Sequence, residues 1–537
     1  MESVLTGTAA QPIILRAVPG ERVKIDMYQA GGSSQERFSI SGDHAWYWGL
    51  EITSSNPASR VRQSAGTLPG TVANYGGSSG KVGDHIRLIN VLIHDLRGNG
   101  LSWHPGQGGE VYGSLIYNNG SVAPDRTHGH GIYTQNKEGT TPEKRIADNF
   151  IFNQFWNNCS LRGGDAYLHN FRVEGNALFN AGAGQGIGFR DTGDFFLGTS
   201  SAAHNNTVIG NAVYSQHASG GAVHIAYGRA DYQTLDFSDN YVVGRLGFFQ
   251  PYVDLHAARN TVVGSVTGDA PSSGIALVQN PGGQKVLVRG NEYEPGRANV
   301  VVYNWNKAAS VSVDLSDVLA PGASYRIQHV YDFFGEPVAQ GIYTGGSVSI
   351  PMLPKIAPRP LGAGFGECAT GDDGDTWCLK EPTTLPITFG AFVVLSDGCG
   401  DSTPVVPPKA STCDSSIEGD CWYDYAEAEN QKLESPMAVS SHADASGASY
   451  VSSATESEGQ IDFIVNPPKS GDYVVWARVL APVATADSFW VSSNGGAWDV
   501  YDVAEGTWSE QWQWTRVNGR TKVRIHGFSL LMRGLTR

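Results

Sequence analysis

Five short segments share one pattern and carry most of the side chains in this sequence that could do chemistry. Each starts on a small or polar residue and then alternates apolar and polar positions: GLSWH (100–104), GIYTQ (131–135), NCSLR (158–162), GIGFR (186–190) and AVHIA (222–226). If these segments are stacked strands, alternate side chains face outward in a column about 20 Å long. The outward polar residues would be His104, Tyr133, Gln135, Arg162, Arg190 and His224.

Such a column has the chemistry to bind and cleave an anionic glycan. Arg162 and Arg190 would repel each other unless an anion lay between them, and the guanidinium fork suits a uronate or sulfate. A β-eliminating lyase must neutralise the substrate carboxylate and then needs a base and an acid. The candidates for those roles beside the two arginines are Tyr133, His104, His128, His130 and His224.

Other residues near the column support alternative hypotheses about the function. Gln135, His130, Asp165, Asp191 and Asp194 are candidate substrate-binding residues, but the aspartates also follow the arginines closely and would neutralise them in a structural network. A glycoside hydrolase would need two carboxylates, which Asp125, Asp165, Asp191 and Asp194 could supply. His128 and His130 flank glycines and would cap a turn; a zinc site there lacks further ligands at a matching spacing. A third reading is a non-catalytic glycan-binding or adhesive protein.

The elements that would position these residues belong to a repeat in the first 300 residues. The repeat alternates apolar residues, then has an Asn and a second apolar run: IRLINVLIHD (86–95), IADNFIFNQ (146–154), FRVEGNALFN (171–180), LDFSDNYVVG (235–244), LHAARNTVVG (255–264) and VLVRGNEYE (286–294). Each copy holds strand-length runs and is too short for a helix. An Asn in the same turn of each coil would bond to its neighbours above and below. We therefore predict a parallel β-helix over 1–298.

The core of that solenoid should contain one inward side chain per coil from the five segments. The predicted inward stack is Leu101, Ile132, Cys159, Ile187 and Val223.

The pattern changes at Asn299, where strands without the Asn repeat predict a small β-sandwich over 299–398 that caps the solenoid. A Pro/Ser-rich linker follows at 399–421. We expect a second β-sandwich over 422–537, so the predicted fold class is all-β, a right-handed parallel β-helix with two β-sandwich modules.

Two parts of the sequence resemble known families. GTAAQPIILRAVPGERVKID (7–26) and GHGIYTQN (129–136) resemble the right-handed parallel β-helix repeat proteins, many of which are polysaccharide lyases and hydrolases. YAEAEN (425–430), GDYVVWARV (471–479) and WSEQWQWTRVNG (508–519) resemble carbohydrate-binding β-sandwich modules. That second resemblance implies a structural calcium ion bound by Glu427 and Glu429, whose spacing would put both carboxylates on one face of a strand. The sequence departs from that family after Glu510, where no acidic residue follows.

Charge and cysteines narrow the partners and the compartment. The net charge is −15, no basic patch with interleaved aromatics occurs, and no apolar run reaches a membrane span, so we expect neither nucleic acid nor membrane. We expect a monomer with a polysaccharide partner and no organic cofactor. Disulfides pairing Cys368 with Cys378 and Cys413 with Cys421 would indicate secretion, although no signal peptide precedes the first strand. Cys159 would be a buried filler, and Cys399 has no assigned partner.

Overall fold

The structure is a computed structural model of the 537-residue chain. It describes residues 1–399 except 19–20, 30–35, 76–80, 140–141, 165, 183, 187–192, 217–220 and 229. It also describes 426–535 except 443–444, 446–448, 454, 456–457, 466–474, 482–487, 494–497, 503–508 and 517–527. The chain forms two compact units, Met1–Asp401 and Ser402–Arg537. The predicted linker therefore lies outside the described residues apart from Cys399.

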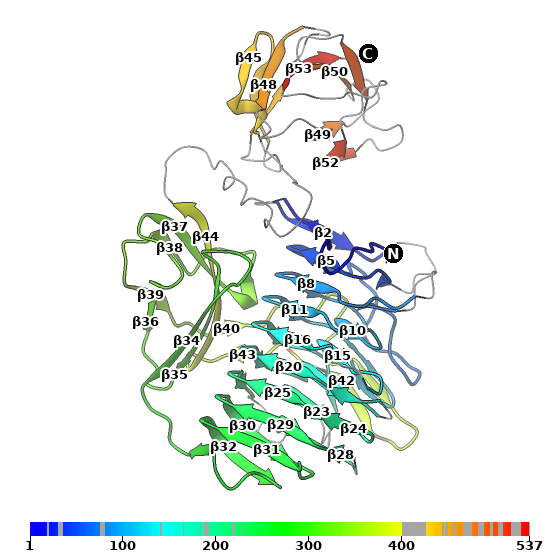
Figure 1. Cartoon of the computed structure of the whole chain (residues 1–537), viewed down its shortest axis with the longest axis vertical. Coiled ribbons are helices and arrows are strands. Elements are labelled where there is room, and N and C mark those ends of the chain that lie inside the picture. The colour runs from blue at the N-terminus through cyan, green and yellow to red at the C-terminus, as the bar shows by residue number, and fades with distance from the viewer. Residues whose placement is uncertain are drawn as a thin grey trace. The chain divides into compact units, whose positions relative to one another are not determined.

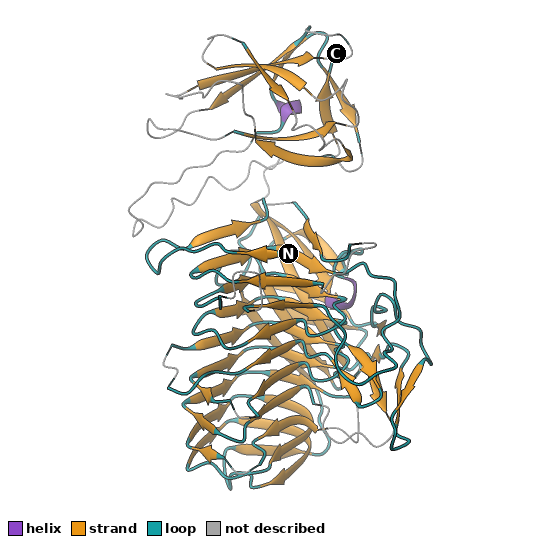
Figure 2. Cartoon of the chain, turned by 90° about the vertical axis from the view of Figure 1, so that its right-hand side faces the viewer, coloured by secondary structure: helices purple, strands orange, loops and turns teal. Residues whose placement is uncertain are grey.

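The first unit begins with a parallel β-helix, as predicted. One face is a nine-stranded parallel sheet that contains β2 (Ile13–Arg16), β5 (Ala45–Trp48), β8 (Arg87–Ile89), β11 (Glu110–Tyr112), β16 (Lys144–Ala147), β20 (Phe171–Glu174), β25 (Asn206–Ile209), β29 (Thr234–Ser238) and β31 (Asp254–Ala258). The strands follow one another along the solenoid in sequence order (Figure 1). Figure 2 shows the same stacking from the side.

The other two faces join into one 18-stranded sheet with two columns. Column one holds β3 (Val23–Asp26), β6 (Leu50–Thr53), β9 (Leu92–His94), β12 (Leu115–Tyr117), β17 (Phe150–Phe152), β21 (Ala177–Phe179) and β26 (Ala212–Tyr214). Column two holds β1 (Glu2–Ser3), β4 (Arg37–Ile40), β7 (Thr71–Ala73), β10 (Leu101–Trp103), β15 (Ile132–Thr134), β18 (Cys159–Arg162), β23 (Phe195–Gly198) and β27 (Gly221–Ile225). The longer strands β30 (Tyr241–Phe248) and β32 (Asn260–Gly268) cross both columns, and β33 (Ile275–Val278) is the last parallel strand.

A ladder of buried asparagines fixes the turn between the nine-stranded sheet and column one. The Nδ2 group of each asparagine donates to the Oδ1 atom of the next at 2.9–3.0 Å, in the order Asn149, Asn176, Asn211, Asn240 and Asn260. The residue before each asparagine has a positive φ, a conformation that Gly, Asp and Asn tolerate best. The predicted ladder is confirmed for four of the six repeat copies, and it includes one further coil at Asn211. Asn90 and Asn291, from the other two copies, bond to each other instead.

The inward stack of column two corrects one coil of the predicted alignment. Leu101 pairs with Ile132, Ile132 with Cys159, Cys159 with Phe195 and Phe195 with Val223. All five are at most 1% exposed, and Cys159 is the buried filler that we expected. Phe195 thus occupies the coil that we had assigned to Ile187. The predicted strand 186–190 is wrong at its start, because Gly186 belongs to β22 (Gly184–Gly186), which pairs antiparallel with β42 (Thr376–Leu379).

A β-sandwich follows the solenoid and begins earlier than the sequence indicated. The copy predicted at 286–294 falls in β34 (Gln284–Gly290), which is antiparallel to β35 (Ala298–Asn304). They form a five-stranded sheet with β44 (Phe389–Cys399), β37 (Ala323–His329) and β38 (Ala339–Ile342), beside the pair β36 (Ser310–Asp314) and β39 (Ser347–Pro351). The 3-10 helix η1 (Val330–Asp332) follows β37, and β40 (Lys355–Ile356) pairs with β43 (Thr384–Leu385).

The sandwich covers the outer surface of column one. Outward rings of that column, Tyr117, Phe152, Phe179 and Tyr214, pack in one apolar cluster with Tyr303, Tyr331 and Phe389. Column one is therefore covered by the sandwich. The predicted site residues lie on column two.

An arm between β40 and β43 reaches back to the solenoid. It contains the hairpin of β41 (Cys368–Thr370) and β42, closed by the predicted disulfide between Cys368 and Cys378. Trp377 and Leu379 pack against Val122 and Phe155 of the solenoid. Val122 lies in β13 (Ser121–Ala123), which forms a hairpin with β14 (Arg126–His128). Cys413 and Cys421 lie outside the described residues.

The second unit is also built of antiparallel strands. Its larger sheet has the order β45 (Lys432–Glu434), β48 (Gln460–Val465), β53 (Phe528–Leu535), β50 (Ser488–Ser493), β51 (Asp499–Asp502). Two pairs accompany it, β46 (Ala438–Ser441) with β47 (Ser449–Ser452) and β49 (Trp476–Ala481) with β52 (Ser509–Arg516). Across the described residues of the whole chain, no helix has the length and apolarity to cross a membrane.

The predicted calcium ligands do not lie on a strand. Glu427 is the N-cap residue of the 3-10 helix η2 (Ala428–Asn430), and Glu429 lies inside that helix. The prediction that both glutamates lie on one face of a strand was wrong, because they belong to one short helical turn. Both residues are partly buried. Burial and then the charge of Glu427 raise the pKa of Glu429, so the two carboxylates repel each other.

Candidate functional site

The outward side of column two carries a nearly continuous row of aromatic and cationic side chains. We call it the aromatic face and define it by Tyr75, His104, His130, Tyr133, Trp156, Arg162, Phe196, His224, Tyr227 and Phe249. Neighbouring rings along it lie 4.0–5.5 Å apart between centroids. The strand spacing of about 4.8 Å explains the distance between Phe196 and His224, which occupy the same position of adjacent coils.

His104 and Tyr133 form one end of the aromatic face on adjacent strands. Ser102 pairs with Tyr133 in the register of β10 and β15, and the rings of His104 and Tyr133 meet edge to face at 5.2 Å. Burial lowers the pKa of His104 to about 4, helped by the charge of Lys144. Burial also raises the pKa of Tyr133. At neutral pH the pair is therefore a free imidazole beside a protonated phenol, which can accept and donate a proton.

A buried lysine supports this end from inside the solenoid. Lys144 is fully buried, and its Nζ group donates to the carbonyl oxygens of Trp103 at 3.1 Å and Gln135 at 2.9 Å. Burial holds the pKa of Lys144 well below its usual value. The predicted binding residue Gln135 is partly exposed, and its Nε2 atom lies 3.5 Å from Nδ1 of His104. The lysine thus ties together the backbone that presents His104 and Gln135.

His130 lies beneath the surface of the aromatic face. Its ring stacks on Tyr133 at 5.1 Å and on Trp156 at 4.7 Å, and the residue is only 5% exposed. Burial, followed by the charge of Arg162, lowers the pKa of His130 to about 3. His130 is therefore a neutral packing element between two rings, and its placement below Tyr133 leaves little surface for the substrate contact that we had assigned to it.

Arg162 occupies the centre of the aromatic face inside a box of three rings. The guanidinium carbon lies 5.1 Å from the ring centre of Phe196, 5.4 Å from that of Tyr227 and 5.5 Å from that of Trp156. Its Nη1 atom is buried and has no hydrogen-bond partner among the described residues. Aromatic faces attract a guanidinium but leave its N–H groups unsatisfied. The box thus holds a cation whose buried Nη1 group has no acceptor among the described residues.

His224 lies at the far end of the aromatic face, on β27. Its ring is stacked between Phe196 at 4.5 Å and Phe249 at 4.0 Å. The register pairs Ser160 with Phe196 and Phe196 with His224, so His224 lies two coils from the strand of Arg162. The structure brings His104, Tyr133, Arg162 and His224 onto one face, as the sequence indicated.

The four remaining candidates near the arginines fall into two groups: three lie outside the described residues, and Asp194 is buried inside the solenoid. Arg190, Asp165 and Asp191 lie outside the described residues, and Gly198 pairs with Arg162 in the strand that Arg190 was expected to continue. Asp194 is 1% exposed and accepts hydrogen bonds from Asn158 Nδ2 at 2.7 Å and the Ala181 amide at 3.0 Å. Burial raises its pKa well above the usual range. The assignment of Asp194 to substrate binding was wrong, because the residue fastens a turn inside the solenoid.

Asp125 and His128 form a separate group on the hairpin of β13 and β14. His128 contacts Thr67 Oγ1 at 2.9 Å through Nδ1 and Asp125 at 3.2 Å through Nε2. The Gly66 amide also donates to Asp125 at 2.8 Å. These bonds fasten the 66–67 loop onto the hairpin, which agrees with the alternative that His128 serves the turn.

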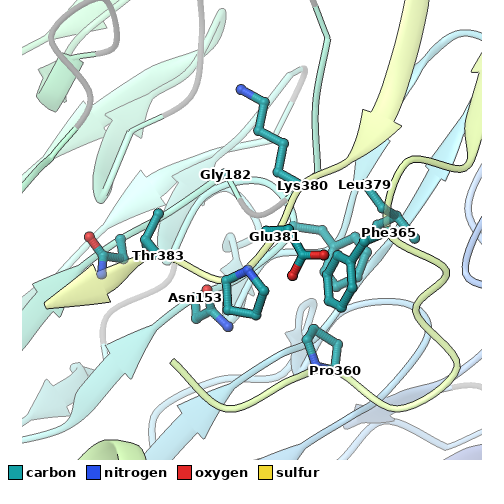
Figure 3. A pocket seen from close by; sticks show the side chains of 11 residues that line it. Asn153, Gly182, Pro360, Phe365, Leu379, Lys380, Glu381 and Thr383 are labelled. Carbon is teal, nitrogen blue, oxygen red and sulfur yellow. The ribbon is translucent and has the colours of Figure 1, made fainter. Parts of the chain in front are cut away.

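A small pocket lies away from the aromatic face, between the arm and two turns of the solenoid. Its lining includes Asn153, Gly182, Pro360, Lys380 and Glu381 (Figure 3). Glu381 is paired with Arg359 at 2.8 Å, and both side chains are well exposed. The lining shares no residue with the aromatic face, so the pocket adds nothing to the candidate site.

The sequence reasoning missed the aromatic residues that surround Arg162. Phe196 lies in β23, the strand that the alignment of GIGFR displaced, whereas Trp156 and Tyr227 lie just outside β18 and β27. A signal was present: FFLG (195–198) is a stronger strand former than the glycine-rich GIGFR. Choosing the better strand former would have put Phe196 on the face beside Arg162.

Comparisons with known proteins give a fold likeness and no family. No protein-family model matches the sequence, and no curated protein matches it. Similar solved structures include pectate lyase Pel9A, with 14% identity, coverage of 51% of this chain and 64% of that chain, and a TM-score of 0.35. Another is the tailspike protein gp49 of Acinetobacter baumannii bacteriophage Fri1, a capsular polysaccharide depolymerase, with 9% identity, coverage of 67% of this chain and 78% of that chain, and a TM-score of 0.21. A third is the periplasmic alginate epimerase AlgG, with 14% identity, coverage of 50% of this chain and 76% of that chain, and a TM-score of 0.22. The chain spans less than two thirds of the pectate lyase, and likeness at this level concerns the fold alone.

Proposed function

We propose that this protein binds an acidic polysaccharide along the aromatic face and cleaves it by β-elimination. The observation that carries the proposal is Arg162, a cation with an unsatisfied Nη1 atom inside a box of rings. Aromatic rings stack on the apolar faces of sugars, and a guanidinium binds a carboxylate through two parallel hydrogen bonds. The row matches an extended chain of sugars that carry carboxylates.

The proposed reaction uses three neighbouring coils of column two. Arg162 binds the uronate carboxylate and so acidifies the hydrogen on the adjacent carbon. His104 takes that proton as a free imidazole, the bond from the next carbon to the glycosidic oxygen breaks, and a carbon–carbon double bond forms. Tyr133 donates its phenolic proton to the leaving oxygen. Burial favours the required protonation states, the neutral imidazole and the neutral phenol, at neutral pH.

Paired-aspartate hydrolysis is less well supported by the described residues. Of the four candidate aspartates, Asp194 is buried in hydrogen bonds and Asp125 is bound to His128 on the hairpin. Asp165 and Asp191 lie outside the described residues. A hydrolase needs two carboxylates on opposite sides of the scissile bond, and neither described aspartate reaches the aromatic face.

Binding without catalysis is the second candidate function, and the length of the aromatic row favours it. A row of rings alone suffices for adhesion to a glycan, but His104 and Tyr133 add an acid and a base that adhesion does not require. The test is a panel of uronate-containing and neutral polysaccharides. A rise in ultraviolet absorbance from unsaturated products means elimination, reducing ends alone mean hydrolysis, and binding without either product means adhesion.

The buried imidazole of His104 predicts a specific pH dependence of stability. An unfolded histidine titrates near 6.5, and the folded His104 has a pKa of about 4. Between these values the unfolded chain binds a proton that the folded chain does not, so stability falls as the pH is lowered through this window. His104→Gln should remove a contribution on the order of 2–3 kcal/mol to that fall, measured by urea unfolding at pH 7 and pH 4. His130 and His329 shift in the same direction and remain in both proteins. Identical pH dependence in the two proteins would contradict the assignment.

A calcium ion in the second unit remains part of the proposed function. Two partly buried carboxylates that repel each other, Glu427 and Glu429, are stabilised by a cation between them. Chelation should lower the melting temperature of the second unit, and Glu429→Gln should remove this response. The expected shift is a few degrees, measured by calorimetry on the full chain with and without chelator. No shift on chelation would leave the pair as surface glutamates.

We also propose that the protein acts outside the cell. The Cys368–Cys378 disulfide supports this proposal, because disulfides persist in oxidising compartments.

A further inference from the structure

A second group of chemically active side chains lies on a turn of the solenoid near its first coils. The tripeptide Gly-Asp-His occurs twice, at 42–44 and at 83–85, each time at most one residue before a strand of the nine-stranded sheet. The two strands, β5 and β8, are parallel neighbours, and Asp43 bridges to Asp84 in the same register. Two copies of one motif therefore lie one above the other, although 41 residues separate them.

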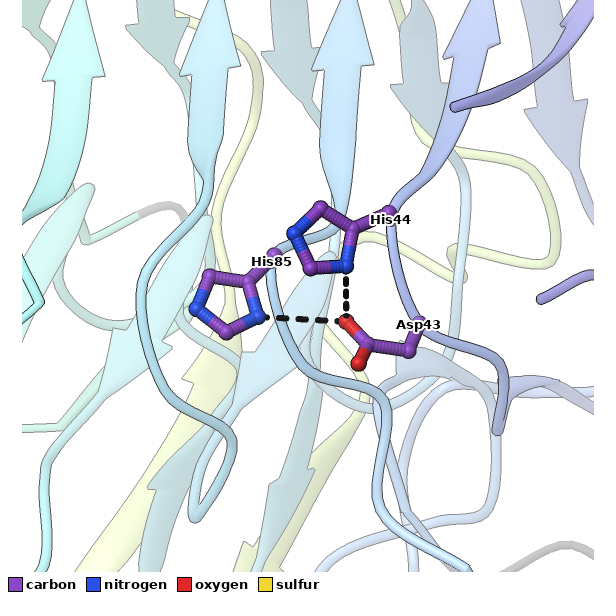
Figure 4. A group of neighbouring side chains, drawn as sticks. All are labelled: Asp43, His44 and His85. Atoms are coloured by element: carbon purple, nitrogen blue, oxygen red, sulfur yellow. Dashed lines mark hydrogen bonds and ion pairs between the residues drawn. The ribbon is translucent and has the colours of Figure 1, made fainter. Parts of the chain in front are cut away.

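The backbone at both copies is held in an uncommon conformation. His44 has a φ of 48° and His85 a φ of 50°, in the left-handed region that few residues other than glycine adopt. The two rings stack at 4.5 Å between centroids, with 18° between their planes (Figure 4). The next coil has Gly108 at the equivalent place, and a Cβ atom there would meet the His85 ring at 2.8 Å. The turn thus presents two histidines side by side against a tight third coil.

Both imidazoles direct Nδ1 at the same carboxylate oxygen. Asp43 Oδ1 lies 2.8 Å from Nδ1 of His44 and 3.1 Å from Nδ1 of His85. The His85 contact has hydrogen-bond geometry, but the shorter His44 contact does not, and Nδ1 of His44 is a buried atom without a hydrogen-bond partner among the described residues. A close nitrogen–oxygen contact that no hydrogen bridges fits two atoms that share a cation.

We propose that Asp43, His44 and His85 bind a divalent transition-metal ion of the zinc class. Their three ligand atoms lie within 4.8 Å of one another, and two imidazoles with one carboxylate suit zinc and its neighbours better than calcium or magnesium. The side chains are 23–44% exposed, so water can complete the coordination. Because the histidines come from adjacent coils, the ion cross-links the start of the solenoid. The site shares no residue with the aromatic face or with Glu427 and Glu429.

The test compares metal binding by the metal-free full chain and by matched variants. Zn²⁺ should raise the melting temperature, because an ion that binds only the folded state stabilises it. Co²⁺ should bind one equivalent and give the visible absorption bands of a cobalt ion bound by nitrogen and oxygen. His44→Asn and His85→Asn keep a residue that tolerates the left-handed backbone, so the turn can still form. Each should weaken affinity at least about 100-fold, since even an outer partner of a metal ligand contributes roughly 10–100-fold.

Two controls separate the metal site from general effects. His204 pairs with Asp231 at 2.9 Å in another, smaller sheet of the solenoid, formed by β19 (Leu168–His169), β24 (Ala202–His204) and β28 (Asp231–Tyr232). His204→Asn and Glu429→Gln should therefore keep the full Zn²⁺ response. Asp43→Asn keeps the shape of the group and a hydrogen-bonding oxygen for His85, but should lose Co²⁺ binding. The proposal is overturned if Zn²⁺ leaves the wild-type melting temperature unchanged, or if the two His→Asn variants respond as strongly as the wild type.

Discussion

Replacing Arg162 with alanine is expected to lower kcat/KM on an acidic polysaccharide by about 10²–10³-fold, or about 3–4 kcal/mol of transition-state binding. The guanidinium is the one group in the proposed reaction that contacts the uronate carboxylate, and the ring box around it holds no carboxylate among the described residues. Without it, the substrate charge is uncompensated and the adjacent hydrogen is no longer acidified. Arg162→Lys should recover only part of the activity, because an ammonium ion lacks the planar fork.

The controls for Arg162 separate substrate binding from folding. Arg259 is an exposed arginine that pairs with Asp239 on a different turn of the solenoid, so Arg259→Ala should leave activity unchanged. Arg162→Ala itself should melt close to the wild type. If it unfolds the protein, and Asp165→Asn destabilises it equally, the arginine belongs to a structural ion network. Full activity of Arg162→Ala would remove the arginine from the proposed reaction.

Phe195→Ala is expected to lower the free energy of unfolding by about 3–5 kcal/mol, since the change leaves a cavity in a packed core. Phe195 is 1% exposed and stacks inward between Cys159 and Val223. Denaturant unfolding measures the effect. Phe249→Ala provides the matched control, because that ring is 38% exposed at the outer end of the aromatic face and should contribute about 1 kcal/mol or less.

Phe196, the next residue along β23, provides a test of which residues of this strand face inward and outward. Phe196 faces the other side of the strand and contacts Arg162 and His224. Phe196→Ala should therefore reduce glycan binding more than Phe195→Ala does, when both are compared as folded protein. A Phe195→Ala variant as stable as the wild type would show that another segment fills this coil.

The repeating parts of the fold are predictable from the sequence alone. Alternating apolar residues predicted the strands, and the asparagine after each strand predicted the ladder, because both signals act within a few residues of chain. The disulfide between Cys368 and Cys378 was likewise predictable from a short intervening loop. His104, Tyr133 and Arg162 were placed on one face because each lies at an outward position of the alternation, although Tyr133 precedes the offset of the other two by two residues.

Long-range contacts in the folded chain determine which segment fills each coil and which face of the solenoid stays uncovered. Ile187 and Phe195 both begin apolar segments, and lengthening a turn by several residues costs little conformational entropy, so periodicity does not choose between them, although strand propensity favours 195–198. The covering of column one by the sandwich and the stacking of His44 on His85 depend on contacts between distant residues. Such contacts follow from the register of whole coils, which local sequence signals do not contain.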